Sequence, residues 1–217
     1  MFAKSIQLIP PHKLIAFLTV VSLTTFSSAA SLALISGTVI DQHDGQPLTE
    51  VQGFIEQGLT RPIKTTQSDA EGHYEFPDVI PGTIGIFAYK DGYAFGGFSI
   101  LANAGDDHQN QSIMLKEPSS ISGRVLTGRK KPVAEANIVR VLLIDGTLSD
   151  PAAKKFSIPF TKIRQFGFQV PASNSKGIFS INQLPIGETA FIKVTHSKFA
   201  QQISDHTKVG ASGANIT

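Results

Sequence analysis

The sequence has neither cysteine nor tryptophan. Without cysteine the chain forms no disulfide and offers no thiolate as a nucleophile or metal ligand. Small secreted eukaryotic domains usually depend on disulfides, so an exported chain of this composition fits a bacterial envelope better. The absence of tryptophan removes the largest aromatic face available for stacking on a sugar ring. Any sugar contact would therefore depend on tyrosine or phenylalanine.

The chain also lacks an excess of charge of either sign. Residues 1–30 contain Lys4 and Lys13 and no acidic residue, so the remainder holds 17 of the 19 basic residues against 17 acidic ones. Nucleic-acid binding normally requires a concentrated basic surface. We therefore expect no nucleic-acid partner.

No hydrophobic run is long enough for an ordinary membrane span. The apolar stretch Leu14–Phe26 is about two thirds of the ~20 residues that a spanning helix needs, and Ser and Thr interrupt it. Lysines precede it, and Ser27–Ala30 supplies small residues for cleavage. This pattern predicts a secretory signal peptide at residues 1–30, with a membrane anchor as the alternative. The cleaved protein would have no stable membrane span and would be periplasmic, outer-membrane-associated or extracellular.

No stretch shows a sustained helical period, and turn signals recur every 8–12 residues or so, which predicts an all-β protein with little helix. The unit Ser68–Tyr93 illustrates the pattern. Tyr74 and Phe76 alternate with polar residues, Pro77 is expected to end that strand, and Ile84, Ile86 and Ala88 share an inward face. Strands are expected near residues 34–41, 51–56, 65–68, 73–76, 84–88, 95–101 and 111–115.

A weaker copy of this unit occurs at Ser173–Phe199, and Ile121–Val125 repeats Ile35–Val39. Matches in the same order predict a tandem duplication, with a boundary at Lys116–Ser120. The copy carries one extra residue after Gly187. A slip of one residue would turn every side chain to the other face, so a β-bulge is expected near Glu188–Thr189.

The second copy is longer at Leu142–Pro171, where four phenylalanines lie among lysines and an arginine. A long structured insertion is often functional. The alternative, which we favour, is a pair of lengthened strands that pack on the neighbouring domain. Ala214–Thr217 aligns with the interior of the strand at 111–115, which suggests a fragment of a longer protein.

The stretches SGTVIDQHDGQPLTEV, SDAEGHYEF and DVIPGTIGIFAYKDGY resemble the carboxypeptidase regulatory-like domain family of transthyretin-like, carbohydrate-binding-like β-sandwiches. The resemblance covers residues 33–117 and is weaker over 119–217. It implies two tandem seven-stranded Greek-key β-sandwich domains (transthyretin-like or Ig-like), at 33–117 and 119–217. It also implies non-catalytic modules, which in this family accompany peptidases, outer-membrane receptors and surface proteins.

Catalytic patterns are not found. The histidines after residue 30 show no H-x-x-E or H-E-x-x-H spacing, and there is no G-x-S-x-G elbow. Asp69–Gly72 and Asp106–Asp107 are typical of turns rather than of calcium sites. The first strand has no lysine for the Lys–Asn crosslink of some adhesin repeats. We expect no enzyme activity, metal or cofactor.

The sequence therefore predicts an exported binding or structural module of the cell envelope that recognises a protein or a glycan through loops and strand edges. The alternative is an accessory or spacer region of a larger secreted enzyme, such as a peptidase, or of an outer-membrane receptor. No oligomeric state follows from the sequence. The candidate ligand contacts are Phe156, Phe160, Arg164, Phe166, Tyr89, Phe95 and Phe98.

Overall fold

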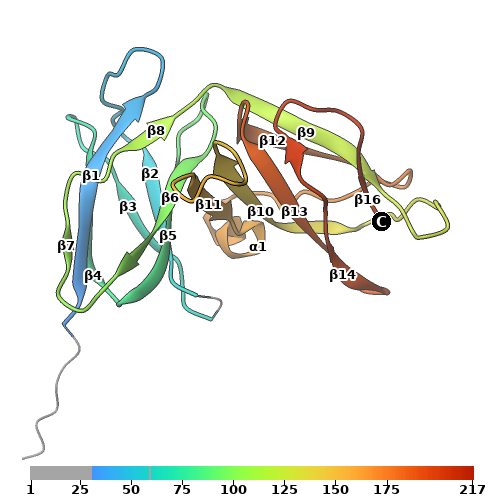
Figure 1. The fold of residues 1–217 in the computed structure, drawn as a ribbon, viewed down its shortest axis with the longest axis horizontal. Helices are drawn as coiled ribbons and strands as arrows, with labels where there is room; N and C mark the ends of the chain where they lie inside the picture. Colours follow the sequence, from blue (N-terminus) through green and yellow to red (C-terminus); the bar gives the residue numbers. More distant parts are fainter. Residues whose placement is uncertain (1–30, 59) are drawn as a thin grey trace, which may run out of the picture. The chain divides into compact units, whose positions relative to one another are not determined.

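A computed structural model of the chain describes residues 31–58 and 60–217 (Figure 1). The predicted signal peptide at residues 1–30 lies outside the described residues. The elements are β1 (Ala33–Asp41), β2 (Gln52–Glu56), β3 (Lys64–Gln67), β4 (His73–Val79), β5 (Gly82–Tyr89), β6 (Gly96–Ala102), β7 (Asp107–His108), β8 (Ile113–Leu115), β9 (Pro118–Val125), β10 (Asn137–Asp145), β11 (Lys154–Ile158), α1 (Phe160–Ile163), the 3-10 turn η1 (Arg164–Phe166), β12 (Ile178–Pro185), β13 (Thr189–His196), β14 (Phe199–Ile203), β15 (Thr207–Lys208) and β16 (Ala214–Ile216). The expectation of an all-β protein with little helix is confirmed.

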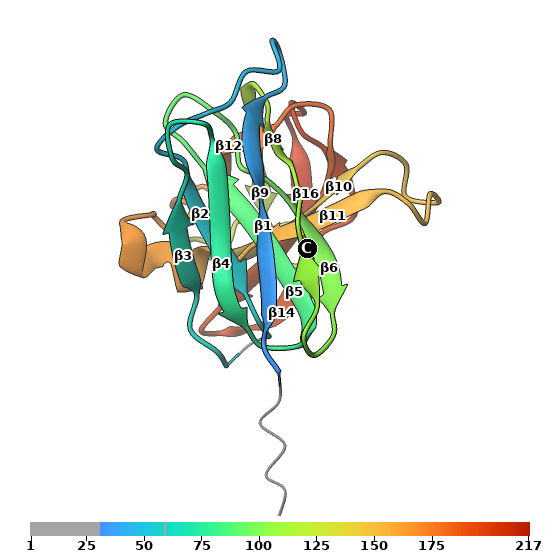
Figure 2. The same cartoon turned by 90° about the vertical axis from the view of Figure 1, so that its left-hand side faces the viewer.

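Residues 33–115, which we call the N-terminal half, contain two β-sheets that contribute to one buried core. One sheet has the order β4-β1-β7, with β8 also paired to β1, and the other has the order β3-β2-β5-β6 (Figure 2). Ile35 and Phe76 from the first sheet meet Ile84, Ile86 and Ala88 from the second in one buried core. The predicted inward faces are therefore correct, because period-2 alternation places these residues on one side of each strand.

The prediction that Pro77 ends its strand is wrong, because β4 continues through Pro77 to Val79. This strand lies at the edge of its sheet and pairs with β1. The register shifts between Ala33 and Ile35, and Asp78 has φ +54°. An edge position combined with a bulge tolerates a residue that has no N–H to donate.

Residues 118–216, which we call the C-terminal half, contain two further β-sheets. Its sheets have the orders β12-β9-β16 and β11-β10-β13-β14, with β15 paired to β13. β16 runs parallel to β9, as β8 runs parallel to β1. Ile121 and Phe179 from one sheet and Ala190 and Ile192 from the other are buried in the same core.

Buried serines make the same pair of hydrogen bonds in the two halves. Ser68 Oγ donates to Leu48 O (2.7 Å) and accepts from Val51 N–H (2.9 Å). Ser173 Oγ correspondingly donates to Val133 O (2.7 Å) and accepts from Ala136 N–H (3.0 Å). A small hydroxyl group thus satisfies a buried loop backbone at matching positions of the two halves.

Asx turns and close backbone approaches also recur. Asp69 Oδ1 accepts from the N–H groups of Glu71 and His73. Asn174 Oδ1 accepts in the same way from the N–H groups of Lys176 and Ile178. A Cβ at Gly37 would collide with the backbone of Gln111, and one at Gly123 with the backbone of Ala214. Glycine is needed here for space rather than for its φ angle.

The bulge predicted near Glu188–Thr189 is wrong. β13 begins at Thr189 and pairs with β10 without a shift as far as Lys193. The extra residue lies in the preceding turn, where Gly187 has φ +81°. A turn accommodates an added residue without disturbing the ladder, so Ala190, Ile192 and Val194 are still buried, as the alignment predicts.

The connection between the halves is shorter than the predicted boundary. β9 already begins at Pro118, so Lys116-Glu117 is all that separates it from β8. The two halves also share one hydrophobic core: Phe54, Phe87 and Phe95 of the N-terminal half belong to the same buried cluster as the apolar residues of the C-terminal half. Contacts group Ser31–Thr217 as a single unit.

Candidate functional site

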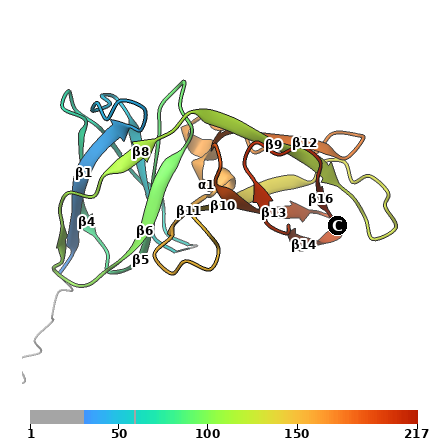
Figure 3. The same cartoon turned by 45° about the horizontal axis from the view of Figure 1, so that its top comes forward.

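The segment Leu142–Pro171 joins the two halves. β10 and β11 form a hairpin, and α1 and η1 follow β11 (Figure 3). Phe156, Phe160 and Ile163 are buried in the core that also contains Phe87 and Phe95 of the N-terminal half. Of the two interpretations of this insertion, the structure agrees with packing against the neighbouring half.

A turn at Gly167 separates the rings of Phe166 and Phe168. Gly167 ends η1 in the left-handed region, at φ +93°, and its N–H donates to Arg164 O. That conformation suits glycine because it has no Cβ. The flanking Phe166 and Phe168 both reach back to Phe54, at ring-centroid distances of 5.5 and 5.9 Å.

Aromatic rings from both halves form a continuous cluster. Tyr89 lies 5.0 Å from Phe95 and 5.0 Å, edge to face, from Phe168, measured between ring centroids. Phe95 lies 5.5 Å from Phe168. Such pairs contribute about 0.5–1.5 kcal/mol each beyond the area that they bury, so this cluster stabilises the joint between the halves.

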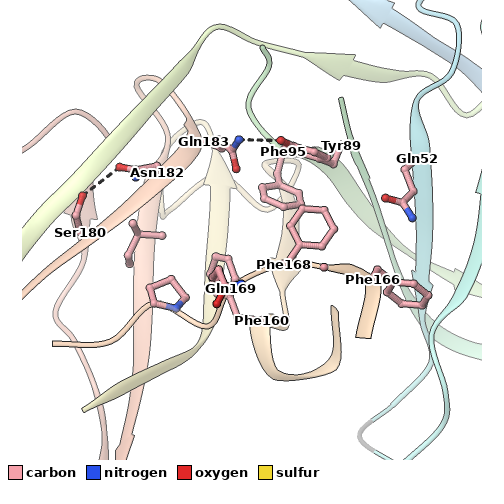
Figure 4. A pocket seen from close by; sticks show the side chains of 13 residues that line it. Gln52, Tyr89, Phe95, Phe160, Phe166, Phe168, Gln169, Ser180, Asn182 and Gln183 are labelled. Carbon is pink, nitrogen blue, oxygen red and sulfur yellow. Dashed lines mark hydrogen bonds between the residues drawn. The ribbon is translucent and has the colours of Figure 1, made fainter. Parts of the chain in front are cut away.

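An open pocket of about 520 Å³ lies beside this cluster (Figure 4). The N-terminal half contributes one amide and two aromatic side chains, and the C-terminal half contributes the rest. The lining residues are Gln52, Tyr89, Phe95, Phe160, Phe166, Gly167, Phe168, Gln169, Pro171, Ser180, Ile181, Asn182 and Gln183. Every one of these side chains is formally uncharged at neutral pH.

Hydrogen bonds tie the polar wall to the aromatic one. Gln183 Nε2 donates to the Tyr89 hydroxyl (2.8 Å), and Ser180 Oγ donates to Asn182 Oδ1 (3.1 Å). Burial raises the pKa of Tyr89 and the neighbouring Asp91 adds to the rise, while the bond from Gln183 opposes it. Tyr89 therefore remains a neutral phenol near pH 7.

Four of the predicted contact residues line this pocket: Tyr89, Phe95, Phe160 and Phe166. Phe95 and Phe160 are almost wholly buried, at 1% and 5% exposed, so they form its base rather than a surface platform. Phe98 faces the N-terminal core, and Phe156 is buried in the shared core. These two rings are therefore not placed to touch a ligand, because neighbouring strands cover them. Arg164 is exposed and does not line the pocket.

Sequence reasoning missed the amide residues of the pocket, and it did not single out Phe168 as a contact. Gln52 lies on β2, Gln169 follows η1, and Asn182 and Gln183 lie on β12. These segments are distant in sequence and meet only after the halves pack. The Phe-Gly-Phe run around Gly167 is a local signal that could have identified Phe168.

A buried ion cluster lies elsewhere along the same joint. Arg140 forms a bidentate pair with Glu56, with N–O distances of 2.6 and 2.7 Å, and Lys162 Nζ lies 3.1 Å from the same carboxylate (side-chain exposure of Glu56, 9%). Burial works to raise the pKa of Glu56, but the hydrogen bonds and charges of Arg140 and Lys162 outweigh it and lower the pKa. Glu56 is therefore ionised and fixes two basic side chains of the C-terminal half.

A second ion cluster holds the short connection. Lys116 Nζ lies 2.9 Å from Glu188 Oε1 and 3.1 Å from Asp145 Oδ1. Burial opposes the charge of Lys116, but the two carboxylates outweigh it and raise its pKa. Burial raises the pKa of Glu188, whose Oε2 has no hydrogen-bond partner among the described residues.

Within residues 31–58 and 60–217, no three His, Asp or Glu side chains gather closely enough to hold a metal ion. The same described residues contain no helix that is long and apolar enough to cross a membrane.

No protein-family model matches the chain, and no curated protein matches it. Several solved structures are similar. A variant of the shaft pilin SpaA from Lactobacillus rhamnosus GG matches at 12% identity and a TM-score of 0.33, over 86% of this chain and 96% of that one. The Bacillus anthracis TIE protein matches at 14% identity and a TM-score of 0.35, over 86% of this chain and 33% of that one. A streptococcal ancillary pilin matches at 10% identity and a TM-score of 0.33, over 88% of this chain and 64% of that one. This chain thus spans about a third of the TIE protein and just under two thirds of the ancillary pilin. TM-scores of this size carry no function from one protein to another.

Proposed function

We propose that this chain is an exported, non-catalytic β-sandwich module that acts in the cell envelope or outside the cell by recognising a protein or a glycan. The observation that carries the proposal is the pocket formed jointly by the two halves. Its base is aromatic and its rim carries side-chain amides, a combination suited to binding.

The lining of the pocket supports binding rather than catalysis. General acid–base chemistry needs a titratable group near the reacting atoms, most often His, Asp, Glu or Lys. The titratable side chain in the lining is Tyr89, whose pKa is raised. Ser180 donates to Asn182 rather than to a histidine, so it has no base to activate it.

The recurring serine, Asx and glycine contacts support a tandem arrangement of two related sandwiches, as the resemblance to carboxypeptidase regulatory-like domains implies. The secretory pattern at residues 1–30 supports export. Expression of the full chain in a bacterial host, with fractionation of the cells, tests this part. A product retained in the cytoplasm at its full mass would contradict it.

Recognition at the pocket is tested by blocking it. Asn182→Trp places a large ring at an exposed position of the rim, and Asn215→Trp makes the same change at an exposed position of β16 away from the pocket. We expect the first variant to lose capture of the partner from solubilised envelope material and the second to retain it. Equal capture by both variants would contradict recognition at this site.

The spacer alternative has support of its own in the shared core and in the two ion clusters, which hold the halves at a set spacing. A spacer of a larger enzyme or receptor needs this rigidity but not the pocket. It predicts that Arg140→Met impairs the activity of the larger enzyme or receptor, whereas Asn182→Trp leaves that activity unchanged.

A further inference from the structure

The pocket between the halves selects against charged ligands. A phosphate, carboxylate or sulfate group would normally be met by Arg or Lys, and an ammonium group by Asp or Glu. The lining contains none of these four residue types. A charged group held against this lining would give up part of its water without gaining a counter-charge, which favours a neutral occupant.

The pocket nevertheless offers many hydrogen bonds. Each side-chain amide supplies one acceptor oxygen and two donor hydrogens, and the lining holds four such groups: Gln52, Gln169, Asn182 and Gln183. Among the described residues, Asn182 uses its oxygen for Ser180, and Gln183 uses its nitrogen for Tyr89. The amide nitrogen of Asn182 and the amide oxygen of Gln183 have no hydrogen-bond partner in the part of the chain that the structure describes, so they are available to pair with hydroxyl groups.

Half-buried rings complete the site. Tyr89, Phe166 and Phe168 are each partly exposed, and contacts with neighbouring rings hold them in place. A pyranose ring is polar around its rim and apolar on its C–H face, so it matches an aromatic surface flanked by amides. Because packing already orders these rings, binding would cost little side-chain entropy.

The volume suits more than a single small group. About 520 Å³ lies within the range of ~300–1,000 Å³ usual for ligand pockets. A second open hollow of about 610 Å³ shares Gln52 and Tyr89, but Glu50, Lys90 and Asp91 also line it. The preference for a neutral ligand therefore applies to the first pocket alone.

We propose that this pocket binds a neutral oligosaccharide. The inference rests on the proposed function, because it names the ligand class of the same site. A peptide is less well matched: extended peptides usually pair with a free strand edge, and on β12 the N–H of Phe95 already occupies the carbonyl of Gln183 at 2.9 Å.

The first experiment uses the purified exported protein on an array of neutral oligosaccharides with sialylated and sulfated counterparts. We expect binding to neutral members, a loss of about tenfold or more in affinity for Asn182→Ala and for Phe168→Ala, and unchanged binding for Asn215→Ala. Preference for the acidic counterparts, or equal binding by the Asn182→Ala and Asn215→Ala variants, would overturn the proposal.

The second experiment reads the site directly. Titration of the 15N-labelled protein with maltohexaose, cellohexaose and chitohexaose should shift the side-chain amide signals of Gln52, Gln169, Asn182 and Gln183 with one of them. If no neutral glycan binds, yet Asn182→Trp still abolishes capture of an envelope protein, the ligand class is wrong and the proposed function stands. If no neutral glycan binds and Asn182→Trp also leaves protein capture unchanged, both are overturned.

Discussion

Replacing Arg140 with Met should loosen the joint between the halves. Arg140 donates to both oxygens of the Glu56 carboxylate, and Glu56 is 8% exposed, so the substitution leaves a buried charge with a weaker set of partners. Breaking a buried ion pair from one side typically costs about 3–5 kcal/mol. Because Lys162 stays 3.1 Å from the carboxylate, we expect a smaller loss than this, about 2–3 kcal/mol.

Urea unfolding followed by circular dichroism measures this loss. The matched control is Arg124→Met, which removes an exposed arginine from β9 and should change stability by less than about 0.5 kcal/mol. A double-mutant cycle with Glu56→Gln should give a coupling energy of about 1.5 kcal/mol or more. If the coupling is below about 0.5 kcal/mol, or if Arg140→Met equals its control, the ion cluster does not hold the halves together.

The same carboxylate predicts a pH dependence. The pKa of Glu56 is lowered in the folded protein from its ordinary value of 4.5. A lowered carboxyl pKa contributes stability that is present above the unfolded pKa and is lost as pH falls through the folded value. We expect the wild type to lose stability below pH 4.5 more steeply than Glu56→Gln in parallel urea titrations. Identical slopes would show that Glu56 does not titrate differently in the two states.

Three further changes test the fold and the pocket. Ser173→Ala leaves the Ala136 N–H and the Val133 carbonyl unpaired in a buried loop, so it should lower the unfolding free energy by about 1–3 kcal/mol. Ser68→Ala should give a similar loss. A loss under about 0.5 kcal/mol would contradict the role of these hydroxyls. Gly123→Ala would force the backbone of Ala214 away from β9, so we expect the free energy of unfolding, measured by heat or urea, to fall by at least about 2 kcal/mol. Gly128→Ala is the control and should be tolerated, because a Cβ there meets open space. Tyr89→Phe removes the acceptor of the Gln183 amide, so we expect ligand binding to weaken while stability changes by less than about 1 kcal/mol; unchanged binding would remove Tyr89 from the site.

Local chemistry explains why much of the fold could be read from the sequence. The alternation at Tyr74 and Phe76, and at Ile84, Ile86 and Ala88, identified inward faces, because strand geometry alone determines which side chains share a side. Asp69 and Asn174 marked turns, because an Asx side chain bonds backbone only a few residues away. The prediction at Pro77 was wrong because an edge strand tolerates a residue without an N–H group. The prediction at Glu188–Thr189 was wrong because the preceding turn accommodates the extra residue.

The sequence by itself therefore determined the all-β class, the turn positions and the apolar faces, since each depends on residues close together in the chain. Only the tertiary structure decided what covers those faces. Phe95, Phe98 and Phe156 are apolar in any context, but their burial depends on which strands lie against them. The pocket likewise exists because Gln52, Tyr89, Phe168 and Asn182 come from four separate segments that meet when the two halves pack. Periodicity shows which side of a strand avoids water, and it contains no information about which partner covers that side.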